Sequence, residues 1–338
     1  LNGAPLPKTE RNAPRLVIIE PKGLQRMEEL VYANQIPLQG LRKLSKEFNY
    51  QLSQVNRFAQ MLPFNDRQVF EAMRMGLVRI MTMGITGFDT PASAEGIKES
   101  LVAWEAISKY AHFYCAYADD SPLVSAIKLN FKKGAQSLRN AKDFDEFDRA
   151  AFIRNYLHPQ YGLLLDLHQA LGYETAAEVL NGGFAFNYSS KSVFSQDFFN
   201  LQYFTGLDPN APEFSLQRRL GRKLFFDPIL SQDLDRSCAS CHKPGLAFSD
   251  GLAKSQARGG GFLARNTPGL YNTLYAEKFF YDLRADRMET QMEHVIFSPK
   301  EFASSYRIIF KRLKADEVYQ NLFKQAFSTE GGGMSRYK

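Results

Sequence analysis

The sequence predicts an all-α fold, and two observations indicate it. Apolar residues recur at steps of three and four in the first half of the chain, as in Phe70, Met73, Leu77 and Ile80. This spacing places them on one face of a helix. A second segment has the same spacing at Ile97, Leu101, Trp104, Ile107, Ala111 and Tyr114. The period-two alternation typical of strands is nearly absent, so helices are expected to form both halves of the molecule.

Chain length, the positions of prolines and the helical pattern divide the sequence into three parts. The 338 residues are enough for about two domains. Residues 1–23 contain four prolines and are predicted to be an irregular or extended lead-in. Residues 24–205 are predicted to form a helical N-terminal domain, an antiparallel bundle because its connections are short. Residues 206–338 are predicted to form the second domain. Helices are expected at 122–140, 143–157, 160–171, 286–294 and 304–327.

Composition excludes several classes of protein. A hydrophobic content of 44% excludes intrinsic disorder, and three cysteines are too few for a disulfide scaffold. No apolar run approaches the roughly 20 residues of a membrane-spanning helix. The net charge of +6 comes from scattered basic residues, which do not indicate a nucleic-acid partner.

The segment Cys238-Ala239-Ser240-Cys241-His242 is the motif that carries chemistry. Two thiols one helical turn apart can form thioethers to one haem, and the adjacent imidazole can bind its iron. A structural zinc site would need a second pair of ligands, and a thioredoxin-like pair would need a βαβ unit. One covalently attached haem c is therefore expected. Because such haem is attached outside the bacterial cytoplasm, we expect an exported, periplasmic protein, which a processed N-terminus could also attach to a membrane.

The residues around this motif resemble a known family. The segments are LGRKLFFDPILS at 220–231, AFSDG at 247–251, RNTP at 265–268, FFYDLRA at 279–285, METQ at 288–291 and SPKEF at 298–302. In this order and spacing, residues 216–325 resemble the N-terminal haem domain of the bacterial di-haem cytochrome c peroxidase family, which includes the MauG-type enzymes. The resemblance implies a cytochrome c-like fold for the second domain.

The resemblance also implies catalytic roles. His242 would be the proximal iron ligand of the peroxidatic haem, and Glu301 the acid/base that moves a proton between the two peroxide oxygens. Gln291 would orient peroxide by hydrogen bonding. Without the family, Glu301 would be read as a solvated glutamate after a proline.

Further positions match the family with departures. Tyr281 stands where the family usually has a tryptophan between the haems, and the same motif places Arg284 beside the cofactor. Asn266 matches a position that contributes to a calcium site, although an Asx-type turn before a proline explains it as well. His294 replaces a common proline. It is either a distal iron ligand or a histidine near the surface or a haem propionate.

The family carries two haems, whereas this sequence has a single attachment motif. We therefore expect a second haem in the full protein. The leading hypothesis is a peroxidase that reduces hydrogen peroxide with electrons from a small redox protein. The alternatives are a non-enzymatic electron-transfer subunit, in which His294 blocks the iron, and a MauG-like oxidase. The N-terminal domain offers a surface for a homodimer or a larger complex.

Overall fold

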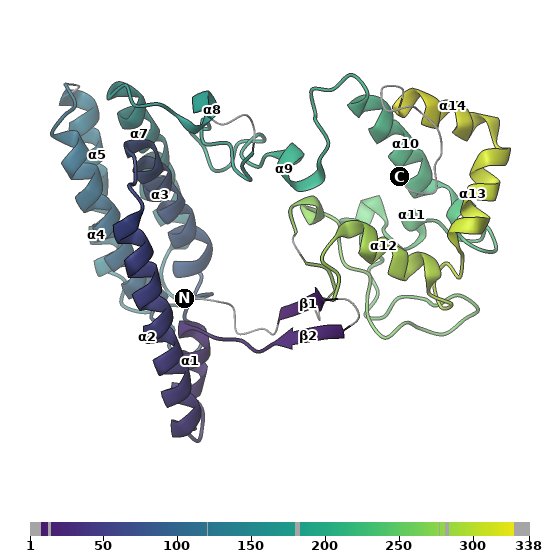
Figure 1. Cartoon of the computed structure of the whole chain (residues 1–338), viewed down its shortest axis with the longest axis horizontal. Coiled ribbons are helices and arrows are strands. Elements are labelled where there is room, and N and C mark those ends of the chain that lie inside the picture. Colours follow the sequence, from purple (N-terminus) through teal and green to yellow (C-terminus); the bar gives the residue numbers. More distant parts are fainter. Residues whose placement is uncertain are drawn as a thin grey trace. The chain divides into compact units, whose positions relative to one another are not determined.

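A computed structural model describes residues 8–12, 15–119, 121–179, 183–276, 278–280 and 284–327, with the backbone alone for 8–12 and 15–19. The predicted all-α fold is confirmed for this part of the chain, apart from one small hairpin (Figure 1). The chain divides into two compact units, Leu1–Asn200 and Leu201–Lys338. Among the described residues, no helix combines the length and apolarity needed to cross a membrane.

The described part of the lead-in is extended, one of the two conformations predicted for it. Strands β1 (Lys8–Asn12) and β2 (Arg15–Ile19) pair antiparallel, with Lys8 opposite Ile19. Strand β2 consists of Arg-Leu-Val-Ile-Ile, in which β-branched residues stabilise extended backbone.

Unit 1 is a helical bundle. Its helices are α1 (Leu24–Val31), α2 (Leu38–Met61), α3 (Asp66–Arg79), α4 (Gly96–Cys115), α5 (Ser121–Arg139), α6 (Arg149–Phe152), α7 (His158–Ala170) and α8 (Ala176–Val179). Helices α3, α4, α5 and α7 pack on one another and form the bundle core (Figure 1). Two π-helical turns, Ile80–Gly84 and Ile153–Leu157, extend α3 and join α6 to α7.

The helix predicted at 143–157 begins later, at Arg149. The Asp148 carboxylate accepts a hydrogen bond from the backbone N–H of Ala151 at 2.8 Å and so caps α6. The Asp143 carboxylate accepts one from the N–H of Asp145 at 2.7 Å, which stabilises a turn instead.

Trp104 lies at the centre of the unit 1 core and is fully buried. Its indole packs edge-on against Phe131 and Phe152, and its Nε1–H donates to the Phe131 carbonyl at 2.9 Å. Burying a large apolar side chain of this kind stabilises a fold by about 1.5–3 kcal/mol. Gly134 on α5 faces the indole so closely that a Cβ there would lie 2.4 Å from Trp104 Cζ2.

Arg74 ties the aromatic segment 183–200 to the bundle. Its guanidinium lies 4.0 Å from the centre of the Tyr161 ring and donates to the backbone carbonyls of Tyr161, Tyr188 and Ser190. Burial lowers the pKa of Arg74, while the neighbouring side chains, Tyr161 first among them, oppose this effect. These carbonyl contacts satisfy a charged group that would otherwise be costly to bury.

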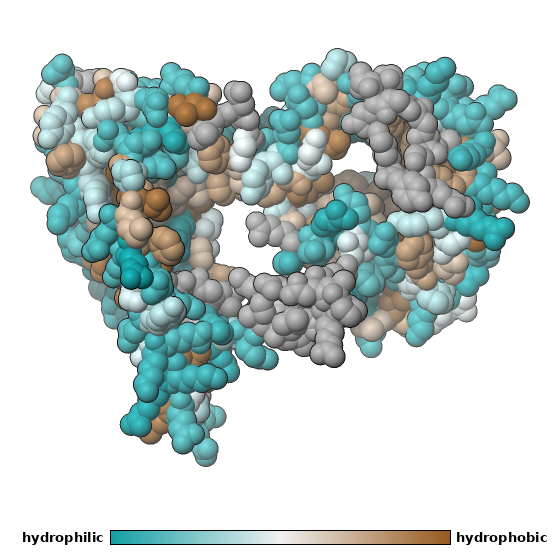
Figure 2. All heavy atoms as spheres, viewed as in Figure 1, coloured by the Kyte–Doolittle hydropathy of each residue, from teal (hydrophilic) through white to brown (hydrophobic). Residues whose placement is uncertain are grey.

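Helix α2 is the least covered element of unit 1. None of its residues is fully buried, and Val55, Phe58 and Met61 are 48%, 60% and 70% exposed. Apolar side chains are visible among hydrophilic ones along this helix in Figure 2. Its first half is partly covered: Leu41 and Leu44 are half-buried, and α1 packs against this helix.

His168 gives unit 1 a predicted pH dependence. Its ring stacks on Phe70 with centroids 4.5 Å apart, its Nε2–H donates to the Glu174 carbonyl at 2.9 Å, and burial lowers its pKa. The unfolded chain therefore takes up a proton near pH 6.5 that the folded chain resists, so stability falls as the pH drops below about 6.5. Urea titrations followed by the fluorescence of Trp104, the single tryptophan, should show this fall. His168→Gln should remove most of it, whereas substituting the exposed His112 should not; an unchanged slope in His168→Gln would contradict the assignment.

Unit 2 combines short helices with long loops. Its α-helices are α9 (Leu201–Thr205), α10 (Phe214–Phe226), α11 (Cys238–Cys241), α12 (Met288–Phe297), α13 (Tyr306–Ala315) and α14 (Glu317–Ala326), and short 3₁₀ turns occur at Pro228–Leu230, Pro244–Leu246 and Thr273–Tyr275. The single helix predicted at 304–327 is two helices. Asp316 breaks it, because its carboxylate accepts from the N–H groups of Val318 and Tyr319 and caps α14.

The core of unit 2 lies between α10, α13 and α14. It consists of the buried residues Leu220, Ile309, Leu313, Tyr319 and Ala326. The Tyr319 hydroxyl donates to the Asp227 carboxylate at 2.9 Å, and Arg312 donates to the carbonyls of Ile229 and Gln232 at 3.2 and 2.7 Å. These bonds fix the segment 227–232, which leads from α10 towards the Cys/His motif.

Candidate functional site

The two motif cysteines lie at the ends of the one-turn helix α11. Ser237 precedes the helix, and its N–H donates to the Ser240 hydroxyl at 3.0 Å as part of a capping box. Both thiols are half-buried, and burial raises the pKa of Cys238 and of Cys241. The helical turn thus places the two sulfur atoms one turn apart, as the sequence predicted.

His242 follows α11, and its ring is oriented by the backbone. Nδ1 lies 2.8 Å from the Phe248 carbonyl oxygen. Because a carbonyl oxygen can only accept, Nδ1 carries the proton and Nε2 keeps its lone pair for a metal. Residues 243–249 fold back to bring this carbonyl into place, with Ala247 and Phe248 both in the left-handed region at φ 54° and 60°. Such a conformation costs about 1–3 kcal/mol per residue, a cost that structural context must offset.

Glu301 lies in a turn that follows α12. Its N–H donates to the Ser298 carbonyl at 3.0 Å, and the Ala303 N–H donates to the same oxygen at 2.9 Å. The Phe302 carbonyl accepts from the Gln232 N–H at 2.9 Å, which joins this turn to the segment before the cysteines. Glu301 is therefore half-buried on well-fixed backbone rather than on a free loop.

Electrostatics connect Glu301 with the cysteine motif. Burial raises the pKa of Glu301. A Ser298 hydrogen bond, the positive charges of Arg236 and Arg284, and the electrostatic interaction with His294 oppose this effect. The pKa of Cys241 is raised by burial first and then by the carboxylates of Asp250 and Glu301. The fold has thus brought a carboxyl group from a distant segment into electrostatic range of the motif, and burial favours its protonated form.

Asp250, beside the same motif, is held as a carboxylate. Burial alone would raise its pKa, but hydrogen bonds from Ser255, the Leu252 N–H and Thr267 lower it overall. The Ser255 and Thr267 hydroxyls are also 2.7 Å apart. This buried network joins the loop after His242 to residues 255–267.

Helix α12 carries Gln291 and His294 one turn apart. Gln291 is half-buried, whereas His294 is exposed. The His294 ring meets Phe280 edge-on, with centroids 5.3 Å apart, and the Arg284 guanidinium lies 3.5 Å from the Phe280 ring centre. Phe280 has a φ of 66°, an unfavourable value for a bulky residue. Arg284 and His294 therefore both contact the Phe280 ring, and both lie in electrostatic range of Glu301.

Two other expectations remain predictions. Asn266 is exposed, between Arg265 and Thr267, and no group of three His, Cys, Asp or Glu side chains in the described part of the chain could hold a metal ion. Tyr281 lies outside the described residues.

Arg258 lies in the glycine-rich loop that contains Gly259, Gly260 and Gly261. It forms an ion pair with Asp233, and its Nε lies 2.7 Å from the Asp233 carboxylate. Its N–H donates to the Lys300 carbonyl at 2.7 Å, next to Glu301. The loop is thus fastened to the turn that carries Glu301.

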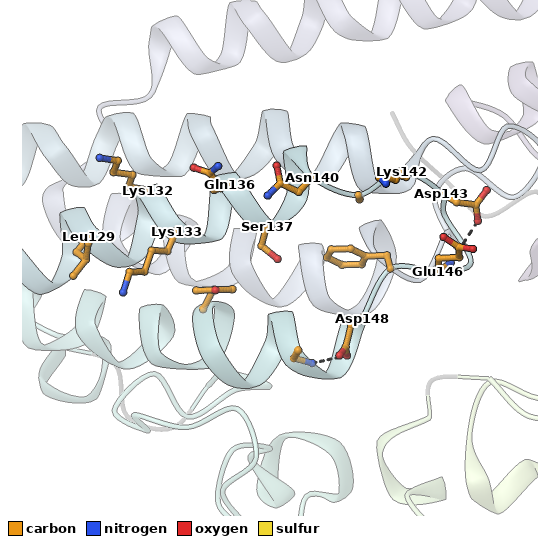
Figure 3. Close-up of a pocket in the computed structure, with 14 residues that line it drawn as sticks. Leu129, Lys132, Lys133, Gln136, Ser137, Asn140, Lys142, Asp143, Glu146 and Asp148 are labelled. Atoms are coloured by element: carbon orange, nitrogen blue, oxygen red, sulfur yellow. Dashed lines mark hydrogen bonds between the residues drawn. The ribbon is translucent and has the colours of Figure 1, made fainter.

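Unit 1 has a groove of about 870 Å³ between α5 and the 141–148 segment (Figure 3). Exposed side chains of both charge signs line it, among them Lys132, Lys133, Asp143 and Glu146. It contains none of the site residues predicted from the sequence. Cys115 is buried in the core of the same unit, as expected for a small apolar residue.

Sequence reasoning missed two contributors to the site. The Phe248 carbonyl is a backbone group, which leaves no signature in the sequence. Arg236 directly precedes Ser237, and its position next to the cysteine motif was the only available signal.

The fold and the site define a class of protein. A helical unit with Cys-x-x-Cys-His on one turn, and an imidazole whose Nδ1 is engaged by a backbone carbonyl, has the features of a c-type haem-binding domain. Residues 216–337 match the family model described as di-haem cytochrome c peroxidase. Residues 216–337 are thus similar to this family.

Curated relatives agree with the family match. The segment is 42% identical over 123 residues to the methylamine utilization protein MauG of Methylorubrum extorquens, covering 36% of this chain and 34% of the relative. It is 33% identical over 119 residues to the cytochrome c551 peroxidase of Pseudomonas aeruginosa, covering 35% and 34%. The chain thus spans about a third of the length of these relatives.

A solved structure also matches. It is a MauG-like protein associated with microbial copper homeostasis, with 31% identity, a TM-score of 0.33, and coverage of 36% of this chain and 35% of that one.

The residues present fit the haem c that the family implies. Cys238 and Cys241 would hold it through thioethers, and His242 would bind its iron through Nε2. The half-buried thiols and the fixed imidazole meet these requirements. The Nε of Arg236 is buried without a hydrogen-bond partner, which is consistent with an anionic group beside α11.

Proposed function

We propose that this chain is the peroxidatic part of an exported haem c peroxidase that reduces hydrogen peroxide with electrons from a small redox protein. The observation that carries the proposal is the pairing of a free His242 Nε2 with a half-buried Glu301 in electrostatic range of Cys241. When bound, haem c supplies the redox chemistry and an iron at which peroxide can bind.

The protein side chains would handle the protons. Glu301 would take a proton from one peroxide oxygen and deliver it to the other, so that the O–O bond breaks with water leaving. Burial raises the pKa of Glu301, which makes the carboxyl a better base and brings its pKa closer to neutral pH. Gln291, one turn from His294 on α12, would hold peroxide through its amide without adding charge.

A MauG-like oxidase is the second candidate. The 42% identity to MauG from Methylorubrum extorquens exceeds the 33% identity to the Pseudomonas aeruginosa peroxidase. The same residues would serve either enzyme, since both candidates need a proton moved between oxygens. The second haem, calcium and a docking role of unit 1 are part of the proposal for the full protein.

Absorption spectroscopy of the haem-loaded protein tests the proposal. We expect a high-spin ferric component that changes when peroxide is added, because His294 is exposed and packs on Phe280. A purely low-spin spectrum that peroxide leaves unchanged, in both the oxidised and the reduced protein, would favour the non-enzymatic electron-transfer subunit and contradict the peroxidase. Peroxide consumption with a reduced small cytochrome, compared with oxidation of a protein side chain, distinguishes the peroxidase from the oxidase.

A further inference from the structure

Arg236 is a mostly buried cation whose hydrogen-bonding capacity is not filled. Its side chain is 17% exposed, and its buried Nε has no hydrogen-bond partner. The Asp235 carboxylate lies 3.5 Å from Nε, but it is 43% exposed and the contact does not qualify as a hydrogen bond. A buried donor without an acceptor costs about 1–3 kcal/mol, and more when it is charged. An anionic acceptor is therefore expected at this position.

The position of Arg236 in the fold indicates where the expected anionic acceptor would lie. The residue precedes Ser237, which is buried and caps α11, so its backbone is fixed against the cysteine turn. The positive charge of Arg236 lowers the pKa of both Cys241 and Glu301, after the larger opposite effect of burial. The Arg236 guanidinium is therefore in electrostatic range of both the Cys241 thiol and the Glu301 carboxyl group.

Among the residues that the structure describes, the carboxylates near the cysteine motif do not fill this role. Asp250 is engaged by Ser255, Thr267 and the Leu252 N–H, and Glu301 interacts with Ser298. Among the described residues, the ion pair found for Arg236 is the long contact with Asp235. The missing acceptor therefore belongs to a group that the chain binds.

We propose that Arg236 is the residue that holds a carboxylate side chain of the haem attached at Cys238 and Cys241. Haem carries two such carboxylates, and a planar guanidinium can donate two parallel hydrogen bonds to one of them. The contact satisfies the buried Nε and fixes the tilt of the macrocycle relative to α11. This inference rests on the proposed haem site and adds a positioning residue to it.

Three variants of the haem-loaded protein test the inference. Arg236→Gln removes both the positive charge and the paired guanidinium N–H donors. Arg236→Lys keeps the charge but lacks the paired donors. Arg307→Gln removes an exposed cation on α13 and serves as the control. We expect the resonance Raman bending mode of the haem carboxylate to shift in both Arg236 variants and not in the control. The haem midpoint potential should fall in Arg236→Gln, because loss of a cation favours the ferric form, and should move less in Arg236→Lys.

The outcomes separate the inference from the proposed function. An unshifted carboxylate mode in Arg236→Gln with full haem content overturns the contact, even if the potential changes, since a charge acts through space. If Arg236→Gln attaches haem poorly, the mode in Arg236→Lys decides the question. Peroxide turnover is measured on the same samples. Normal turnover with an unshifted mode overturns only the role of Arg236, whereas a shifted mode in a protein that never turns over peroxide contradicts only the peroxidase.

Discussion

Replacing Glu301 with glutamine should reduce peroxide turnover by about 10²–10⁴-fold while haem content and the absorption spectrum stay unchanged. Glutamine has the shape of glutamate and can still interact with Ser298, but it cannot accept and return a proton at neutral pH. The effect should appear in kcat, because the lost interaction is made during O–O cleavage rather than in peroxide binding.

The pH dependence of the unsubstituted protein gives a second measure of this role. Burial raises the pKa of Glu301 above the usual 4.5, against the opposing effects of Ser298, Arg236, Arg284 and His294. If the carboxylate is the base, kcat/KM should fall on the acid side at a higher pH than an ordinary glutamate would give. In Glu301→Gln, the residual kcat/KM should no longer show this fall at acid pH.

Glu293→Gln is the matched control. Glu293 lies on α12 of the same unit and accepts a hydrogen bond from the Tyr306 hydroxyl at 2.6 Å, and burial together with Glu293 raises the pKa of Tyr306 to about 12. This substitution should leave turnover within about twofold and cost up to about 1.5 kcal/mol of stability. If Glu301→Gln keeps more than a tenth of the rate, or Glu293→Gln loses as much as Glu301→Gln, the proton-transfer role is wrong.

The helices of unit 1 could be predicted because their buried apolar residues recur at helical spacing. Phe70, Met73, Leu77 and Ile80 share one face by spacing, and all four are buried. The two π-helical turns could not be predicted, because nothing in the apolar spacing marks them. Packing decides their place: the first turn ends at Gly84, which approaches Gly96 so closely that a Cβ at 96 would lie 2.2 Å from the Gly84 carbonyl oxygen.

At the site, the residues needed for covalent haem attachment could be predicted from the sequence. Two thioethers and an imidazole ligand to one haem would require Cys238, Cys241 and His242 at this fixed spacing, so the motif can be recognised in the sequence. The hydrogen bond that selects Nε2 of His242 comes from a carbonyl, and its geometry depends on two left-handed residues that no pattern marks. Arg236 Nε is buried without a hydrogen-bond partner, and this too depends on the tertiary fold, so the sequence does not show it. The family resemblance named the side chains, whereas only the fold shows what surrounds them.

Gly134→Ala should destabilise unit 1 by about 1–3 kcal/mol, although alanine is the better helix former. A Cβ at 134 would lie 2.4 Å from Cζ2 and 2.8 Å from Cε2 of Trp104. The indole cannot easily move away, because it is fully buried against Phe131 and Phe152 and its Nε1–H donates to the Phe131 carbonyl at 2.9 Å. Any shift that relieves the overlap strains that hydrogen bond or opens the aromatic packing.

Gly40→Ala makes the same chemical change in another helix of the unit. Gly40 lies in α2, and a Cβ there would meet its nearest atoms, from Leu30 and Pro37, at an ordinary 4.0 Å. This variant should be neutral or more stable by up to about 1 kcal/mol, because alanine restricts the unfolded chain. Urea unfolding followed by Trp104 fluorescence reports on both variants. Equal stability changes at the two positions would mean that helix propensity, rather than the contact with Trp104, determines the effect, and the close packing of α5 on α4 would then not be what requires glycine at 134.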